Sequence, residues 1–245
     1  YDGGLLPLTT LAWPQSCEEA QAMERLPHDF MRCVDCGHIS NAAFDYAKVP
    51  YSDKPNLMFN KGAIWSEHLQ NVCDLIAIRL PENPIVVEIG CGEGHLLRSL
   101  AKKIPWGKFI GFDPNAEIET EDGLIEARAM LFEPGRHLAE LKPDLIISRH
   151  VFEHLMNPLG FAQEVAFAAN VAECATSLFI EVPCIDGVLA AGRTVDFFYE
   201  HNSHFTTQSL ERLLKRCATS VDLIETSYND EVIYGIASFQ PQSHQ

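Results

Sequence analysis

Short apolar runs of strand length alternate with segments of helical periodicity from about residue 84 onward. This alternation is typical of an α/β domain with a mainly parallel sheet. The helical pattern predicts helices at 93–103, 158–172 and 208–217, and Thr206 or Thr207 can cap the last one. The apolar runs predict strands at 85–89, 108–112, 124–129, 145–148, 177–182, 220–226 and 232–239.

The two ends of the chain differ from this alternation. Only residues 227–230 separate the last two predicted strands, so we expect the last strand to run antiparallel in an otherwise mainly parallel, seven-stranded sheet. Residues 1–62 contain five prolines and no sustained period, which predicts a small, loop-rich N-terminal appendage. A helical pattern at 63–80 joins this appendage to an α/β domain that spans residues 63–245.

Composition and charge narrow the class of protein. The chain has 245 residues, of which 47% are hydrophobic, so it can bury a sizeable core without disulfides or a partner. Its formal net charge of -16 repels nucleic acid and anionic membrane surfaces, so we expect neither as a partner. No apolar run approaches the roughly 18 residues of a membrane span. We expect a cytoplasmic protein, although a targeting segment upstream of Tyr1 stays open.

The eight cysteines show no disulfide framework, so reduced thiols are expected. Only Cys33 and Cys36 form a pattern, a knuckle-like turn in which two thiolates can reach one tetrahedral metal ion. One such pair is half of a structural zinc site.

A glycine-rich turn follows the strand predicted at 85–89. Gly90, Gly92 and Gly94 stand at alternate positions, and glycine is needed where the backbone takes positive φ or lies against a ligand. A dinucleotide fingerprint requires glycine where His95 stands, which argues against a nicotinamide-dependent oxidoreductase. Asp113 ends the next strand about 20 residues later, where a carboxylate can accept hydrogen bonds from ribose hydroxyls. Alternatively, the glycines only make a tight turn and Asp113 caps the following segment.

Glu88, the glycine turn and Asp113 together resemble the class I S-adenosylmethionine-dependent methyltransferases, and the resemblance covers about residues 63–239. It implies a Rossmann-like fold, S-adenosylmethionine as cofactor and a methyl-transfer activity. The resemblance also implies that the end of the third strand lies near the adenine. It implies that the segment after the fourth strand lies beneath the methionine end of the cofactor. The cofactor-binding residues expected on this basis are Glu88, Gly90, Cys91, Gly92, Gly94, Asp113, Met130, Leu131 and Arg149.

The catalytic candidates lie on two later segments. In the resembling family, a histidine at the place of His154 faces the substrate pocket, where an imidazole can take a proton. The run Phe198-Tyr199-Glu200-His201 resembles the sugar C-methyltransferases, in which Tyr-x-Glu-His supplies the base and substrate contacts; Phe198 stands where that subfamily has its tyrosine. We predict His201 as the base, held by Glu200 with its pKa raised toward neutrality, and His154 as an alternative base. The alternatives are a structural pairing of His154 and an ordinary solvated loop around Glu200.

The same C-methyltransferases carry an N-terminal zinc-binding segment with two cysteine pairs. Cys33 and Cys36 would be the second pair. The first pair lies upstream of Tyr1, or one of Cys17, His28 and His38 substitutes for it, or no metal binds. The function that we expect is C- or O-methylation of a small polar metabolite, such as a sugar or a related intermediate. The alternative is a non-catalytic relative that binds the cofactor or a partner.

Overall fold

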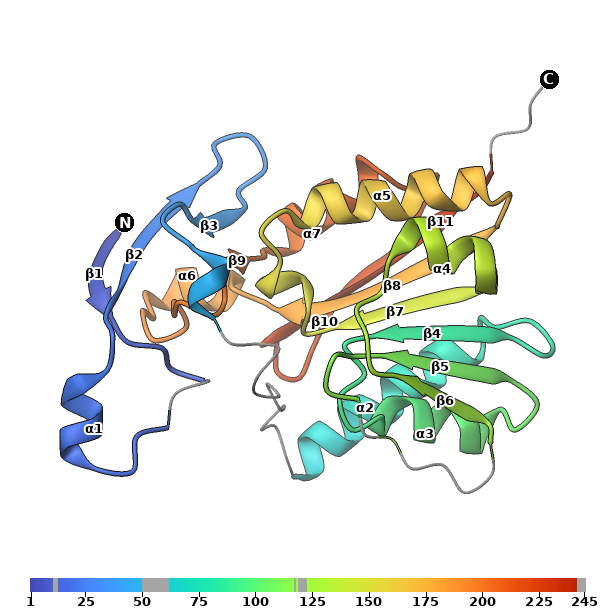
Figure 1. The fold of residues 1–245 in the computed structure, drawn as a ribbon. Coiled ribbons are helices and arrows are strands. Elements are labelled where there is room, and N and C mark those ends of the chain that lie inside the picture. The colour runs from blue at the N-terminus through green and yellow to red at the C-terminus, as the bar shows by residue number, and fades with distance from the viewer. Residues whose placement is uncertain (11–12, 50–61, 117, 119–122, 242–245) are drawn as a thin grey trace.

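The structure is a computed structural model that describes residues 1–10, 13–49, 62–116, 118 and 123–241 (Figure 1). Seven strands form one sheet in the order β10-β11-β8-β7-β4-β5-β6. Neighbours from β8 to β6 pair in parallel, whereas β11 runs antiparallel to both β8 and β10. This confirms the predicted sheet and its antiparallel last strand. The bounds are β4 (Ile85–Ile89), β5 (Lys108–Phe112), β6 (Ile125–Arg128), β7 (Leu145–Arg149), β8 (Thr176–Pro183), β10 (Ser220–Ser227) and β11 (Val232–Phe239).

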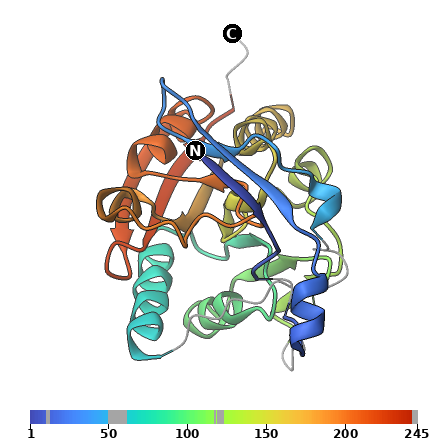
Figure 2. The same ribbon diagram turned by 90° about the vertical axis from the view of Figure 1, so that its left-hand side faces the viewer.

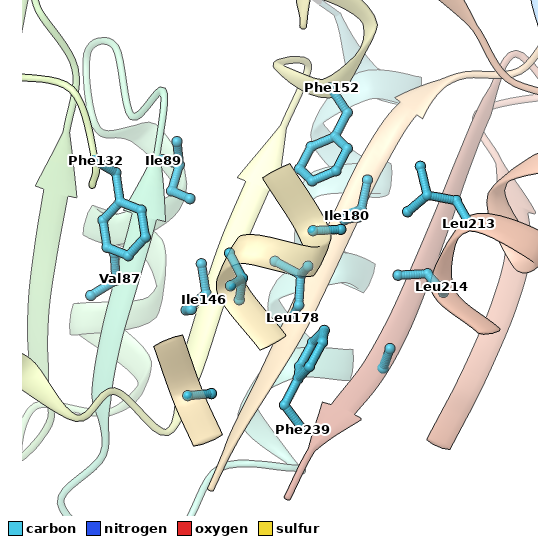
Figure 3. Packing of buried hydrophobic residues seen from close by; sticks show 14 of the residues in the cluster. Val87, Ile89, Phe132, Ile146, Phe152, Leu178, Ile180, Leu213, Leu214 and Phe239 are labelled. Atoms are coloured by element: carbon cyan, nitrogen blue, oxygen red, sulfur yellow. The ribbon is translucent and has the colours of Figure 1, made fainter. Parts of the chain in front are cut away.

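The central strands are apolar throughout because helices cover both faces of the sheet. Successive residues point to opposite faces, so Val87 packs in one core cluster and Val86 in the other. One face carries α4 (Pro134–Leu141), α5 (Pro158–Val171) and α7 (Thr207–Lys215), and the opposite face carries α2 (Ala63–Ala77) and α3 (His95–Lys103) (Figure 1). Figure 3 shows the first cluster: Val87, Ile146 and Leu178 lie on three neighbouring strands, and Leu178 lies beside Leu214 of α7 and Phe239 of β11.

The helix α7 begins as its sequence predicts. Thr206 is its N-cap: the Thr206 hydroxyl accepts a hydrogen bond from the Ser209 backbone N–H, and the Ser209 hydroxyl accepts one from the Thr206 N–H. Among the described residues of the α/β domain, two α-helices were not predicted, α4 and α6 (Asp186–Ala191), because each is too short to show a clear helical period.

The N-terminal region contains more regular structure than its sequence pattern predicted. The strands β1 (Asp2–Leu6), β2 (Leu26–Arg32) and β3 (Ile39–Asn41) form part of a second sheet. The short helix α1 (Cys17–Ala22) lies between β1 and β2 in the sequence. The fourth strand of this sheet, β9 (Ser203–His204), comes from the segment between β8 and α7. Figure 2 shows β1 and β2 in front of the larger sheet. A partner so far along the chain leaves no local sequence signal.

The division of the chain at residues 62 and 63 stays a prediction, because β9 of the second segment completes the sheet of the first. Among the described residues, the structure contains no helix with the length and apolar character that a membrane crossing requires. The cytoplasmic location also stays a prediction.

Candidate functional site

The glycine turn connects β4 to α3, and its three glycines serve different purposes. All three have positive φ, at +70° for Gly90, +47° for Gly92 and +72° for Gly94. A Cβ at Gly90 would overlap Val151, and one at Gly94 would overlap Ile118, so these two glycines permit close packing. A Cβ at Gly92 would meet no atom within 4 Å. Gly92 is therefore the glycine that borders open space.

A cavity of about 720 Å³ adjoins this turn at the carboxyl ends of the central strands, where ligands bind in open α/β sheets. Its size falls within the roughly 300–1,000 Å³ of cofactor and small-molecule sites. The cavity brings together eight of the predicted site residues, which are Glu88, Gly90, Cys91, Gly92, Asp113, Arg149, His154 and His201.

Asp113 lies directly after β5 and has two hydrogen-bonded neighbours. Its Oδ2 accepts a hydrogen bond from the Gly92 N–H at 3.1 Å, and its Oδ1 accepts one from the Asn115 N–H at 2.7 Å. A carboxylate has about four acceptor positions. Asp113 therefore holds the turn and still has acceptor positions for ligand hydroxyls, so its capping and ligand-binding roles are compatible.

Glu88 is a buried carboxyl group at the floor of the cavity. It is only 4% exposed, and its Oε2 atom has no hydrogen-bond partner among the described residues. Burial raises its pKa to about 8, although Arg149 acts in the opposite direction. Glu88 is thus mostly neutral at pH 7 and can both donate a hydrogen bond to a ligand and accept one.

Met130 and Leu131, predicted to lie against the adenine, are not among the residues that line the cavity. The chain bends directly after β6, and these side chains are 37% and 66% exposed. The following residue, Phe132, is the one that packs into the core, against Phe112 and His137. Contact of these two side chains with the adenine stays a prediction. Gly94 is also not among the lining residues, and a Cβ there would overlap Ile118.

A buried ionic network forms another part of the cavity floor, and sequence reasoning missed its central residue, Glu181. Glu181 Oε1 accepts hydrogen bonds from Arg149 Nε at 2.9 Å and Nη2 at 2.7 Å, and Glu181 Oε2 contacts His68 Nε2 at 3.0 Å. Burial would raise the pKa of Glu181, but Arg149, His150 and His68 hold it well below its usual value. The available signal was a single charged residue in the apolar run that predicts a strand at 177–182.

His150 extends this network toward the catalytic candidates. Its ring nitrogens lie 3.2 Å from Glu181 Oε1 and 3.2 Å from Glu153 Oε1. Burial alone would lower the pKa of His150, but the two carboxylates raise it to about 9. At pH 7 both Arg149 and His150 therefore carry positive charge beside Glu181. The Trp65 ring covers the Arg149 guanidinium, 5.7 Å from the ring centroid.

His154 and His201 converge at the far end of the cavity, with ring centroids 4.9 Å apart. His154 Nδ1 donates a hydrogen bond to the backbone carbonyl of Glu200 at 2.8 Å. The Glu200 carboxylate instead accepts hydrogen bonds from the Thr9 N–H at 2.7 Å and the Thr10 N–H at 2.6 Å. The expectation that this carboxylate holds His201 is wrong, because the carboxylate is directed toward the N-terminal segment.

The expected pKa of His201 also needs correction. Burial holds its pKa well below the usual value, and the neighbouring His154 acts in the same direction. The His201 imidazole is therefore neutral at pH 7, the protonation state in which it can accept a proton or bind a metal ion.

Cys33 and Cys36 lie on the turn after β2. The Cys33 N–H donates to the His38 carbonyl at 2.8 Å, and the Gly37 N–H donates to the Cys33 carbonyl at 2.9 Å, as in a knuckle-like turn. Hydrogen bonds with Cys36 lower the pKa of the Cys33 thiol. Within the described ranges, no third histidine, cysteine or carboxylate stands close enough to share a metal ion with them. Zinc requires four ligands, so the described residues do not fit a structural zinc site here.

The parallel sheet and its antiparallel last strand define a Rossmann-like α/β protein, and the cavity beside the glycine turn lies where this fold usually binds its ligand. The model of the methyltransferase domain family matches residues 65–217, so the chain belongs to this family.

Three known proteins illustrate the similarity. The malonyl-[acyl-carrier protein] O-methyltransferase of Magnetococcus marinus is 37% identical over 90 residues, which cover 32% of this chain and about a third (33%) of that protein. Human N-acetylserotonin methyltransferase in complex with S-adenosylmethionine has a TM-score of 0.53 at 15% identity, over 72% of this chain and 53% of that chain. Magnesium protoporphyrin IX methyltransferase of Synechocystis PCC 6803 with bound S-adenosylhomocysteine has a TM-score of 0.51 at 16% identity, over 75% of this chain and 91% of that chain.

The two structural similarities show the fold alone, whereas the family match shows a methyltransferase domain. Together they confirm the predicted methyltransferase domain with a Rossmann-like fold.

Proposed function

We propose that the protein transfers the methyl group of S-adenosylmethionine to an oxygen or carbon atom of a small polar metabolite, such as a sugar or a related intermediate. The observation that carries this proposal is the continuity of the cavity. The same space borders Gly92 and Asp113 at one end and His154 and His201 at the other. A methyl donor held at the first end and an acceptor held at the second would therefore meet without an intervening wall.

The residues at the first end fit the cofactor in three respects. Gly92 leaves open space where a side chain would project, and Asp113 retains acceptor positions for ribose hydroxyls. Glu88 has a buried oxygen without a partner among the described residues, which a polar group of the ligand would satisfy. We assign cofactor binding to these three residues together with Gly90, Cys91 and Arg149. When bound, S-adenosylmethionine supplies an electrophilic methyl group on its sulfonium.

The residues at the second end suit a polar acceptor. His201 is neutral, so it can take a proton from the acceptor, and we assign it as the base. His154 is the alternative base or a group that orients the acceptor. Glu200 is a positioning residue: its carbonyl fixes the His154 ring, and its carboxylate fixes Thr9 and Thr10. Thr10 itself lines the cavity, so the N-terminal segment helps to enclose a small acceptor.

The name of the Magnetococcus relative indicates an acceptor attached to a carrier protein. The N-terminal strands β1 to β3 lie outside the family match, and we propose that this segment limits the site to a free small molecule.

The test is incubation of the protein with methyl-labelled S-adenosylmethionine and a fractionated metabolite mixture, followed by mass spectrometry. We expect a labelled product from the wild-type protein and none from the Gly92→Val variant. Binding of S-adenosylhomocysteine without any labelled product would favour the non-catalytic alternative. A wild-type protein that fails to bind S-adenosylhomocysteine would contradict the proposal.

A further inference from the structure

Glu153, His154 and His201 bring three metal-ligating atoms together in the cavity, all within 4.8 Å of one another. Glu153 and His154 lie on the short 3-10 helix η2 (Phe152–His154), and His201 lies shortly before β9. We propose that this triad binds one divalent transition-metal ion beside the acceptor. The inference rests on the proposed function only for the position of the acceptor.

The donor set selects the class of ion. Two imidazoles and one carboxylate suit first-row ions such as Zn²⁺, Fe²⁺ and Co²⁺, and three protein ligands leave positions open for a substrate. Mg²⁺ and Ca²⁺ prefer sites made of oxygen ligands, so they are not the expected occupants.

The carboxylate of Glu153 provides independent support for an ion. The Glu153 residue is 1% exposed, and neither carboxylate oxygen has a partner with hydrogen-bond geometry among the described residues. His150 Nδ1 lies 3.2 Å from Oε1 as an ion-pair neighbour. A buried carboxylate that lacks hydrogen bonds is costly in free energy. A cation on the cavity side would supply the missing interaction.

The ring of His154 is already oriented for such a role. Its Nδ1 donates a hydrogen bond to the Glu200 carbonyl at 2.8 Å, so Nε2 is the ring nitrogen that would bind the ion. Histidines that bind metals commonly donate their other ring N–H to a carbonyl or carboxylate in this way. Glu200 is in turn held by Thr9 and Thr10, so the N-terminal segment fixes the orientation of a metal ligand from outside the site.

An ion at this position changes which acceptors the enzyme can use. A bound divalent ion lowers the pKa of the water or hydroxyl that it contacts, so with the ion present His201 acts as its ligand rather than as the base, and the proton passes to solvent. The acceptor expected for this site is therefore an oxygen nucleophile, such as a hydroxyl or an enol, that would otherwise be protonated at neutral pH.

The test is a titration with Co²⁺ alone, followed by calorimetry and by visible absorption. It is performed on a Cys33→Ser, Cys36→Ser protein, because these thiols are a competing metal-binding pair. We expect one equivalent of Co²⁺ to bind. Glu153→Gln and His201→Asn in this protein should each weaken binding by more than about 100-fold, above the range for loss of a residue that only orients a ligand. His95→Asn, a cavity histidine outside the triad, should leave the affinity unchanged.

Circular dichroism and S-adenosylhomocysteine affinity show that each variant is folded and retains the cofactor end of the cavity. The metal site is overturned if the parent protein does not bind Co²⁺ stoichiometrically. It is also overturned if the two triad variants bind Co²⁺ as tightly as the parent protein does. Failure of the proposed function is recognised separately, because it appears as loss of S-adenosylhomocysteine binding or turnover in a protein that still binds Co²⁺.

Discussion

The cofactor end of the cavity consists largely of main chain from adjacent segments, whereas the acceptor end consists of side chains from distant parts of the chain. Gly90, Gly92 and Asp113 follow two neighbouring strands, and the Gly92 N–H donates a hydrogen bond to the Asp113 carboxylate. At the other end, the Glu200 carbonyl orients the His154 ring by a hydrogen bond, and the Thr9 and Thr10 N–H groups orient the Glu200 carboxylate. Binding of the donor and handling of the acceptor are therefore built separately. Substitutions at the two ends should separate cofactor affinity from turnover.

The largest expected effect is on the main-chain end. Gly92→Val places a branched side chain in the cavity and forces it onto a backbone with φ of +47°. We expect S-adenosylhomocysteine affinity to fall by at least about 100-fold, which corresponds to roughly 2.7 kcal/mol. Calorimetry measures this loss.

Gly192→Val is the matched control, because Gly192 also has positive φ, at +66°, with open space around it, but lies away from the cavity. The control should share the backbone strain and keep its affinity. Equal affinities in the two variants would mean that the glycine turn is architectural only.

At the side-chain end we expect an effect on turnover alone. His201→Ala removes the group assigned to the acceptor's proton, so the rate should fall by ~10²–10⁴ while S-adenosylhomocysteine affinity stays nearly unchanged. Steady-state kinetics with an identified acceptor, together with calorimetry, separates the two readouts. If His201→Ala and His154→Ala each keep most of the wild-type rate, alignment of the two substrates alone carries the reaction.

Asp113→Ala tests the side chain that we assign to the ribose at the cofactor end of the cavity. Loss of hydrogen bonds to a charged group costs about 1.5–3 kcal/mol, so S-adenosylhomocysteine affinity should fall by roughly 10- to 150-fold. Asp222→Ala is a suitable control, because Asp222 also accepts hydrogen bonds, from Ser220 and Ser238, far from the cavity. Unchanged affinity in Asp113→Ala, with the fold intact, would remove the ribose assignment.

The smallest expected effect is the contribution of Glu88 to the pH dependence of the unfolding free energy. Its pKa is about 8 in the folded protein, against 4.5 as the ordinary value, with Arg149, Glu181 and Asp113 as its charged neighbours. Between these values the folded state holds a proton that the unfolded chain has lost, so the unfolding free energy decreases as pH rises. The decrease is at most about 1.4 kcal/mol per pH unit, and Glu88→Gln abolishes it.

Urea unfolding at pH 6 and pH 7 checks this prediction without ligand. The stability of Glu88→Gln relative to wild type should increase from pH 6 to pH 7, whereas the exposed-site control Glu18→Gln should follow the wild type. Parallel pH dependence in the Glu88 variant and the wild type would show that Glu88 is ionised in the folded protein.

The same contrast explains how much of the fold could be predicted. The strands β4, β5 and β11 have the predicted bounds, because buried parallel and central strands are continuous apolar runs. The N-terminal sheet was missed because its partner β9 has two residues and lies about 160 residues after β3. Long-range pairing of this kind has no local periodicity.

The candidate site shows the same division between local and distant signals. Gly92 and Asp113 were predicted because a strand, a turn and a following strand fix their positions within one short stretch. The orientation of Glu200 could not be predicted, because it depends on Thr9 and Thr10. The exposure of Met130 could not be predicted either, because it follows a bend directly after β6.

A crystal structure with S-adenosylhomocysteine tests the division of the cavity most directly. We predict the ribose hydroxyls within hydrogen-bond distance of Asp113, the chain of the ligand passing Gly92, and its sulfur facing the end of the cavity that contains His154 and His201. A ligand bound outside this cavity, or one with its adenine against His201, would contradict the account.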